Sequence, residues 1–280
     1  MTAPRIFTAE YYARMRALEA GSWWNAAMRD VAGMLLEDVD RPTVGRVLDV
    51  GCGSGQTLAW FVDTFGEWET LGCDVAADAL VAAKPLADGV VQASALDLPI
   101  PDASVDLVIT LDVVQHLPIP GGDSKALAEM YRVLKPGGFL LLRTNAQAYP
   151  RVGDDLAYNF HKYTPEELGG KLTQAGFSTI RLSRLNAVLG LAEIPRELRA
   201  RRAEQSEYRG ILAQARTEAP LVTALKRGWL RLEGQAVRRG FRLPMGRTII
   251  ALCRRPEAPV PAPLSNGDRA PSRVPTSAGR

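Results

Sequence analysis

The chain has 280 residues, which is enough for one well-buried domain with an appendage. Its 46% hydrophobic and 23% charged residues are ordinary for a globular protein, and its net charge of +3 is too small to indicate nucleic-acid binding. No apolar run approaches the roughly 20 residues of a membrane span, and residues 1–7 lack the apolar core of a signal peptide. The three cysteines have no metal-type spacing, so we expect no metal site and reduced, buried thiols, as in a cytoplasmic protein.

Residues 8–38 have apolar side chains at near-helical spacing, interrupted at Gly21 and Ser22, and Pro42 closes the segment. One interpretation is a pair of helices packed on the core domain. The other is an N-terminal helical lid over the substrate pocket, formed by residues 1–40. The lid is suggested by the aromatic side chains gathered ahead of the core, which are Tyr11, Tyr12, Trp23 and Trp24.

A buried strand is predicted at 46–50, followed by glycines at positions 51, 53 and 55 and a helix from about 55 to 66. Glycines at a strand end let the backbone turn sharply and approach a ligand, and the amides of the next helix attract anionic or polar groups. The alternative is an ordinary tight turn between a strand and a helix. The spacing differs from the G-x-G-x-x-G of dinucleotide-binding folds.

Strands and helices alternate through the rest of the core. Strands are predicted at 68–74, 90–93, 105–111, 139–144, 177–185 and 247–253, and helices at 77–86, 124–134 and 165–176. This alternation predicts a Rossmann-like α/β fold, with a mostly parallel sheet and helices on both faces. Ligands bind such folds at the carboxyl ends of the strands, which here carry Asp49, Asp74, Asp97 and residues 110–114.

Asp74 ends the second strand, where a carboxylate can accept hydrogen bonds from both hydroxyls of a ribose. Such charge-assisted bonds contribute about 1.5–3 kcal/mol each. The alternative is an N-cap for the following helix. Asp97 lies close to the end of the third predicted strand, two residues before Pro99. It would either contribute to a ligand site at this edge or simply form the turn before the proline.

Four segments resemble the class I S-adenosylmethionine (SAM)-dependent methyltransferases. They are the glycine loop at 47–57, Ser94-Ala95-Leu96-Asp97-Leu98-Pro99, the approach to the fourth strand at 102–117, and Glu129 to Leu140, which is similar to the family's E-x-x-R-V-L-K-P-G-G. The resemblance covers about 46–186 and 243–255. It implies SAM as cofactor, a core domain of residues 41–186 and 243–255, and a seven-stranded sheet with the last strand antiparallel between the fifth and sixth.

The resemblance also implies which residues bind the cofactor. The acid at Asp97 would hold the adenine amine, and the end of the fourth strand would back the methionine part and face the acceptor. The residues carried over are Asp49, Gly51, Cys52, Gly53, Gly55, Asp74, Val75, Ala95, Leu96, Asp97, Leu111 and Gln115.

The chain has two histidines, both near the predicted edge, and a base is needed only for an acceptor that is not already nucleophilic. His116 follows the fourth strand, and His161 precedes the helix at 165, whose start carries a predicted capping box of Thr164 and Glu167. We expect His116, rather than His161, to orient or deprotonate the acceptor. The alternative for each is a hydrogen-bonded structural role. Tyr158 and Tyr163 are weaker candidates.

Residues 187–242 form a predicted helical insertion with 12 Lys or Arg and 6 Glu, a net charge of +6. One apolar helix face is predicted from Leu221, Leu225, Leu232 and Ala236, flanked by Trp229. It would pack on the core, or form a cap that shapes the acceptor pocket or makes peripheral contact with an acidic partner or membrane surface. Residues 256–280 are predicted to be a disordered tail.

The expected function is methyl transfer to oxygen, nitrogen or carbon of a small molecule, such as a natural product, quinone or lipid-like compound. The alternatives are a SAM-binding protein without transfer and an NAD(P)-dependent oxidoreductase, which the glycine spacing disfavours. Nucleic-acid methylation is not expected, because residues outside the insertion carry a net charge of −3 and no N-P-P-Y motif follows the fourth strand. The sequence does not decide the oligomeric state.

Overall fold

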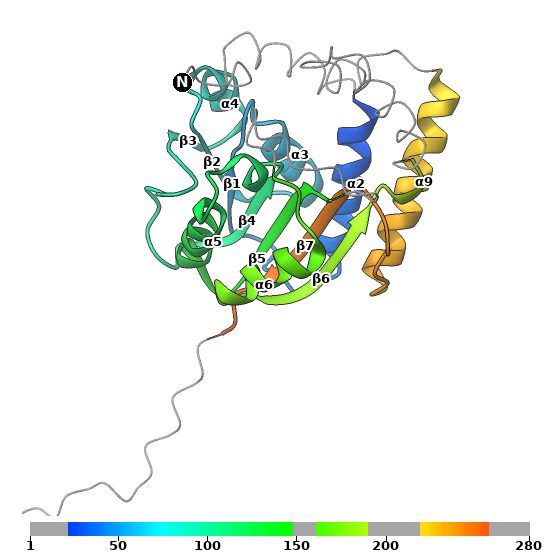
Figure 1. Ribbon diagram of the computed structural model, residues 1–280. Coiled ribbons are helices and arrows are strands. Elements are labelled where there is room, and N and C mark those ends of the chain that lie inside the picture. Colours follow the sequence, from blue (N-terminus) through cyan, green and yellow to red (C-terminus); the bar gives the residue numbers. More distant parts are fainter. Residues whose placement is uncertain (1–21, 148–160, 190–218, 258–280) are drawn as a thin grey trace, which may run out of the picture.

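The sheet runs in the order β3-β2-β1-β4-β5-β7-β6, and all strands are parallel except β7, which is antiparallel to both β5 and β6 (Figure 1). The computed structural model describes residues 22–147, 161–189 and 219–257. The strands are β1 (Arg46–Val50), β2 (Glu69–Asp74), β3 (Gly89–Gln92), β4 (Val105–Leu111), β5 (Leu134–Asn145), β6 (Ser178–Leu185) and β7 (Thr248–Arg254). The predicted Rossmann-like sheet, with its last strand inserted antiparallel, is confirmed.

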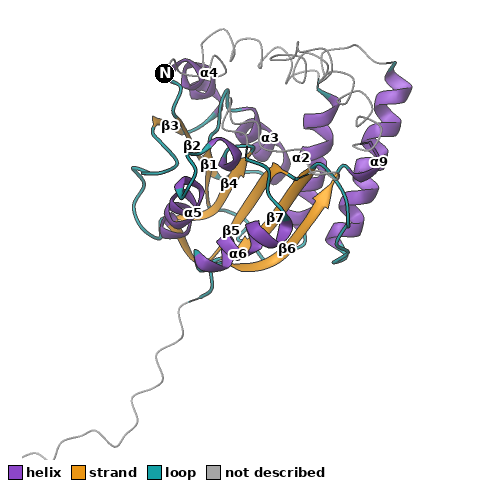
Figure 2. Ribbon diagram, in the orientation of Figure 1, coloured by secondary structure: helices purple, strands orange, loops and turns teal. Residues whose placement is uncertain are grey.

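Helices cover both faces of the sheet (Figure 2). On one face lie α5 (Gly122–Val133) and α6 (Pro165–Gln174), and on the other lie α2 (Trp23–Glu37), α3 (Gln56–Phe65) and α9 (Pro220–Arg238). The short helices are α4 (Ala77–Ala83), η2 (Lys84–Leu86) and η3 (Val114–His116). Among the described residues, no helix is long and apolar enough to cross a membrane.

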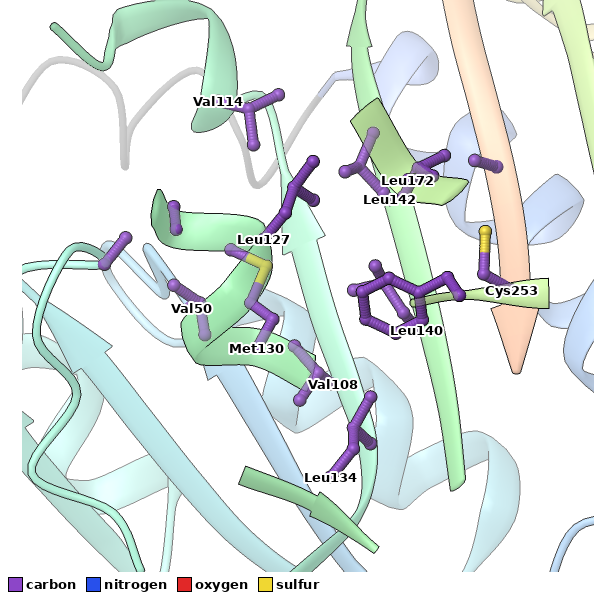
Figure 3. Close-up of a cluster of buried hydrophobic side chains, with 14 of the residues drawn as sticks. Val50, Val108, Val114, Leu127, Met130, Leu134, Leu140, Leu142, Leu172 and Cys253 are labelled. Atoms are coloured by element: carbon purple, nitrogen blue, oxygen red, sulfur yellow. The ribbon is translucent and has the colours of Figure 1, made fainter. Parts of the chain in front are cut away.

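The central strands are apolar along their length because both of their faces are buried. Val108 on β4 and Leu140 on β5 are fully buried and meet Met130 of α5 in the cluster shown in Figure 3. Alternate residues of the same strands, such as Ile109 and Leu141, enter the second cluster beneath α2 and α3. Packing in the two clusters fixes the register of the strands. It therefore also fixes where the strands end along the edge of the sheet.

Two boundaries near β5 differ from the prediction. Helix α5 begins at Gly122 and ends at Val133, and β5 begins at Leu134 rather than Phe139. Leu134 already pairs with Val105, and the register then shifts before Leu107 pairs with Phe139. Gly137, with φ +84°, lies at this irregularity. Gly137 and Gly138 are therefore part of β5 and do not form a turn before it.

Helix α2 begins where the Ser22 hydroxyl accepts a hydrogen bond from Asn25 N at 3.2 Å. Its buried face, which includes Met28, Val31 and Leu35, packs into the second cluster. Packing on the core is therefore confirmed for this helix. The lid over the substrate pocket stays a prediction, since residues 1–21, with Tyr11 and Tyr12, lie outside the described residues.

Helix α9 confirms a helix in the insertion, but the predicted core-facing side is wrong. The buried residues are Leu230, Glu233, Gly234 and Val237. A Cβ at Gly234 would lie 2.8 Å from Val31 Cγ2, so α9 approaches α2 closely at this glycine. The sequence pattern favoured the more hydrophobic stripe, whereas the close backbone approach and the hydrogen bonds of Glu233 select the other side. Residues 190–218 of the insertion and 258–280 of the tail lie outside the described residues.

Candidate active site

The glycine loop is held against the carboxyl ends of β1 and β2. The amides of Gly51 and Cys52 donate to Cys73 O at 2.7 and 3.0 Å. Gly51, Gly53 and Gly55 all have positive φ, which suits glycine. A Cβ at Gly51 would overlap Val113 Cγ2, and one at Gly55 would lie 2.9 Å from Ala83 Cα. At Gly53 no atom of the described residues lies within 4 Å of such an atom, so this part of the structure leaves the loop open to a ligand there.

Asp74 links the end of β2 to the glycine loop. Its Oδ2 accepts from Gly53 N, and its Oδ1 accepts from Ala76 N, both at 2.9 Å. The N-cap of α4 is Ala76, so Asp74 is not the N-cap of this helix. The binding of ribose hydroxyls by Asp74 stays a prediction.

Asp49 and the two nearby cysteines line the buried side of the loop. Asp49 is 2% exposed at the end of β1. Burial and then the charges of Asp49 and Asp74 raise the pKa of the Cys52 thiol, and burial raises the pKa of Cys73 to about 12. The thiols are free and buried, as expected, and remain neutral near pH 7, so Cys52 contributes packing and its backbone amide rather than a nucleophile.

The predicted adenine segment follows β3. Ala95 is buried in the core, Leu96 N donates to Ser94 Oγ at 3.2 Å, and Asp97 is exposed, with its amide bonded to Ser94 O. Val75, predicted to contact the cofactor, is exposed immediately after Asp74. These positions are compatible with an adenine held between the ends of β2 and β3.

Two side chains of α5 hold this segment in place, a role that the sequence analysis missed. Glu129 Oε2 accepts from Leu98 N at 2.9 Å, and Arg132 donates to Leu98 O at 2.9 Å and Ile100 O at 2.8 Å. Arg132 also binds Glu129 and lowers the pKa of that carboxyl. The family-like spacing of Glu129 and Arg132 is the available signal, but by itself it indicates only the entry to β5.

Replacing Arg132 by alanine is expected to raise the Kd for SAM about tenfold, because losing several charge-assisted hydrogen bonds loosens the segment before Ile100. Isothermal titration calorimetry measures this. Arg132→Lys should lie between the two, since lysine lacks the planar fork. Arg46→Ala removes an arginine at the opposite end of β1 and is the control. Equal weakening in both alanine variants would contradict this role for Arg132.

The residue after β4 has an unusual backbone. Asp112 has φ +61°, which is costly for a residue other than glycine and tends to occur at functional sites. Its carboxylate forms an ion pair with Arg143, a buried arginine at the end of β5. Leu111, predicted to contact the cofactor, packs partly against the second cluster. Arg143 was not predicted as a site residue, because a single arginine in an apolar strand pattern carries no motif.

Gln115 connects both histidines to the end of β5. Its Oε1 accepts from Thr144 Oγ1 at 3.1 Å and from Asn145 N at 2.9 Å. His116 Nε2 lies 3.4 Å from Gln115 Nε2, and His161 N donates to Gln115 O at 2.9 Å. The structure therefore brings His116 and His161 together, although 45 positions separate them in the chain. The expected contact of Gln115 with the cofactor stays a prediction.

His161 is oriented by a carboxylate. Its Nε2 lies 2.8 Å from Glu167 Oε1, and its ring meets Tyr163 edge-on at 4.4 Å between centroids. Glu167 N donates to Thr164 Oγ1 at 3.1 Å, which confirms Thr164 as the N-cap of α6. The carboxylate of Glu167 binds His161, so the reciprocal half of the predicted capping box is wrong.

The hydroxyl of Tyr163 is bonded to a carboxylate that also forms an ion pair. Asp123 Oδ2 lies 3.0 Å from Lys171 Nζ and accepts from Tyr163 OH at 3.1 Å. Burial raises the pKa of Asp123, but the hydrogen bonds from Lys171 and Ser124 N outweigh burial and leave the pKa lowered.

Asp123→Asn is expected to reduce the free energy of unfolding at pH 7 by about 2 kcal/mol, less than for a fully buried pair because Lys171 is partly exposed. A carboxyl with a lowered folded-state pKa stabilises the protein above its unfolded pKa of about 4, and this contribution is lost as the pH falls through the folded value. The difference between wild type and variant should therefore shrink below about pH 4. Urea unfolding at several pH values measures it, and a pH-independent difference would contradict the assignment.

These residues fit SAM. One edge of the sheet carries three acids, which are Asp49 in β1, Asp74 at the end of β2 and Asp97 in the segment after β3, and the glycine loop lies beside them. Asp74 would hold the ribose, and the loop amides and Asp49 the methionine part. The acceptor side would be formed by η3 and by residues 161–163.

Comparison with known proteins agrees with this geometry. Residues 48–142 match the family described as Methyltransferase domain. The chain is 37% identical over 123 residues to a probable methyltransferase, ltbC, of Aspergillus luteorubrus, covering 39% of this chain and 43% of that protein. It is 32% identical over 151 residues to a probable S-adenosylmethionine-dependent methyltransferase of Mycolicibacterium smegmatis, covering 53% and 58%. A tRNA (carboxymethyluridine(34)-5-O)-methyltransferase of Arabidopsis thaliana is 33% identical over 101 residues, covering 36% and 24%.

Solved structures share the fold. The phosphoethanolamine N-methyltransferase 2 of Haemonchus contortus, solved with S-adenosyl-L-methionine, aligns with a TM-score of 0.58 at 19% identity over 90% of this chain and 58% of that one. The chain spans less than two thirds of the length of the curated relatives named above.

The matched segment, residues 48–142, contains the glycine loop and the three acids Asp49, Asp74 and Asp97. It is similar to the methyltransferase domain of proteins that are named as SAM-dependent methyltransferases.

Proposed function

We propose that this chain transfers a methyl group from SAM to a small molecule. The observation that carries the proposal is the alignment of Asp74 and the open loop at Gly53 with the histidines around Gln115, along one edge of the sheet. SAM supplies an electrophilic methyl group on a sulfonium sulfur. The chain must hold the two reactants in line, which accounts for about 7–11 kcal/mol of the barrier in well-oriented reactions.

Of the two histidines, His161 has the geometry of a base. Its Nε2 lies 2.8 Å from Glu167 Oε1, and a carboxylate partner of this kind orients the ring. His161 would take the proton of an O–H or N–H acceptor. His116, which the sequence favoured, lies against Gln115 and would contact the acceptor instead.

His161→Ala is expected to lower turnover about a hundredfold at saturating SAM, within the usual range for a lost general base. Glu167→Gln, which removes only the orienting charge, should lower turnover less and shift the pH profile of kcat. Formation of S-adenosylhomocysteine measures both. His116→Ala is the comparison. If His161→Ala leaves the rate and the pH profile unchanged, His161 is not the base.

The acceptor class is tested with tritiated SAM and three separate pools: a low-molecular-weight cell filtrate, an organic lipid extract and total RNA. Label should enter a component of the filtrate or the lipid extract and be absent with Asp74→Ala protein. Label in RNA alone would overturn the small-molecule proposal, an outcome with some precedent because one relative acts on tRNA. No transfer to any pool would favour SAM binding without transfer.

A further inference from the structure

Large apolar side chains are exposed unevenly over the described residues. Every exposed Leu, Trp, Phe and Met among them lies between residues 220 and 247, and the exposed large apolar residues elsewhere are Val or Ile. The set is Leu221 (72% exposed), Leu225 (66%), Trp229 (42%), Leu232 (63%), Phe241 (63%) and Met245 (45%). Single exposed apolar residues are ordinary, but a contiguous group marks an interaction surface.

Four of these residues form one face of α9. Leu221, Leu225, Trp229 and Leu232 are spaced by 4, 4 and 3 residues, which aligns them along one side of a helix. The opposite side packs on α2 through Leu230 and Gly234. Figure 1 shows α9 as the outermost helix, beside α2 and next to β6. We call these four residues the α9 stripe.

The stripe projects past the edge of the sheet that carries the site. Helix α9 runs antiparallel to β6, since Arg181 Nε donates to Arg238 O at 3.0 Å and Asn186 N donates to Glu233 Oε2 at 2.6 Å. Asn186 follows the carboxyl end of β6, which is parallel to β5. The helix before Glu233 therefore extends about 20 Å beyond that end, at 1.5 Å per residue. The stripe lies on this projecting part.

The charge around the stripe is positive. Residues 220–247 contain seven Lys or Arg and one acid, Glu233, which is buried. Arg227 and Arg231 pair with Asp30 on the side facing α2, and Arg238 pairs with Asp38. Their side chains remain 37–53% exposed. Arg239 and Arg242 are exposed beyond the helix.

The positive charge around the α9 stripe distinguishes among its possible binding partners. A second copy would bring two cationic faces together. Of the chain's own segments outside the described residues, 1–21, 190–218 and 258–280 carry net charges of +1, +1 and +2, so they offer no acidic complement. Only 148–160 is acidic, with one Arg and two Asp, and its net charge of −1 does not balance this surface. RNA would meet the charge, but three of the four stripe residues are leucines, which provide no stacking surface for bases.

We propose that the α9 stripe, with Arg239 and Arg242, docks on an anionic lipid surface. Interfacial helices of this kind bury an apolar stripe at the headgroup boundary while arginines attract anionic lipids. Docking places the open edge of the sheet beside the lipid. The inference concerns binding alone and stands whether or not the protein transfers a methyl group.

Vesicle flotation of the full chain tests this. The protein should float with vesicles of equal parts phosphatidylglycerol and phosphatidylcholine, less so as salt rises, and remain unbound with phosphatidylcholine alone. Leu225→Ser with Leu232→Ser should lower partitioning at least tenfold, given the apolar area removed. Arg239→Gln with Arg242→Gln should weaken binding and flatten its salt dependence. The control Val81→Ser replaces a valine that is 75% exposed on α4 and should bind like wild type.

Several results would overturn the proposal. They are no flotation with anionic vesicles, flotation unchanged by the double serine variant, and a wild-type dimer by light scattering that this variant converts to monomer. A shift of tRNA in a gel that the serine variant abolishes would assign the surface to RNA. Circular dichroism melts check that both double variants are folded; if the serine variant is not, the salt dependence of the glutamine variant decides.

Discussion

Asp74→Ala is expected to raise the Kd for SAM about a thousandfold, which corresponds to about 4 kcal/mol. The carboxylate would lose two charge-assisted hydrogen bonds to the ribose, each contributing about 1.5–3 kcal/mol. The substitution would also leave Gly53 N and Ala76 N without the carboxylate oxygens to which each donates a hydrogen bond at 2.9 Å. Calorimetric titration with SAM measures the change.

Asp74→Asn separates the two effects. The amide keeps one oxygen and nearly the same volume but cannot accept hydrogen bonds at both terminal atoms, so its Kd should lie between wild type and alanine. Asp78→Asn removes an acid from the first turn of the adjacent helix and should change Kd by less than about twofold, as expected for a screened surface charge. If Asp78→Asn weakens binding as much as Asp74→Asn, the effect is one of general charge and not of ribose recognition.

Gly51→Ala is expected to reduce the free energy of unfolding by about 3 kcal/mol or more. A non-glycine residue at φ +81° costs about 1–2 kcal/mol. The added Cβ would also overlap Val113 Cγ2, and such overpacking costs about 1–3 kcal/mol. Urea unfolding measures the loss, and SAM binding should fall with it because Gly51 N holds the loop to Cys73 O.

Gly53→Ala is the matched comparison. Its φ of +51° is close to the left-handed minimum, and among the residues that the structure describes no atom lies within 4 Å of the new Cβ, so we expect a loss of only about 1 kcal/mol in stability. Because the loop is open at this position, the methyl should nevertheless weaken SAM binding. These two results together would identify Gly51 as a packing glycine and Gly53 as one that faces the ligand.

A double-mutant cycle tests the cause of the Gly51 effect. Val113→Ala removes the methyl groups that the new Cβ would meet, so it should recover about 1–2 kcal/mol in the Gly51→Ala background. If the two losses simply add, the clash with Val113 is not the reason for the destabilisation.

Most of the fold could be predicted from the sequence because its determinants are local. The buried strands are short apolar runs, and the glycine loop follows β1 directly in the chain. The edge of the sheet with Asp49, Asp74 and Asp97 follows from the topology alone, since parallel strands end on one side.

The parts that were missed depend on contacts between distant segments. Glu129 and Arg132 hold residues 98–100 across about 30 positions of sequence, and their spacing within a helix cannot indicate that target. Glu167 was read as half of a capping box, but it turns to His161 because that ring lies within reach. The buried side of α9 was misjudged because Gly234 permits a close approach to Val31 that hydrophobicity does not encode.

The central claim is that the edge formed by β1, β2 and the segment after β3 binds SAM. Calorimetric titration of the purified protein with S-adenosylhomocysteine tests it most directly, because this product shares every group that the edge would hold. The account predicts saturable one-to-one binding that is lost in Asp74→Ala and absent with NAD. A wild-type protein that is folded and gives no heat with either S-adenosylhomocysteine or SAM would contradict it.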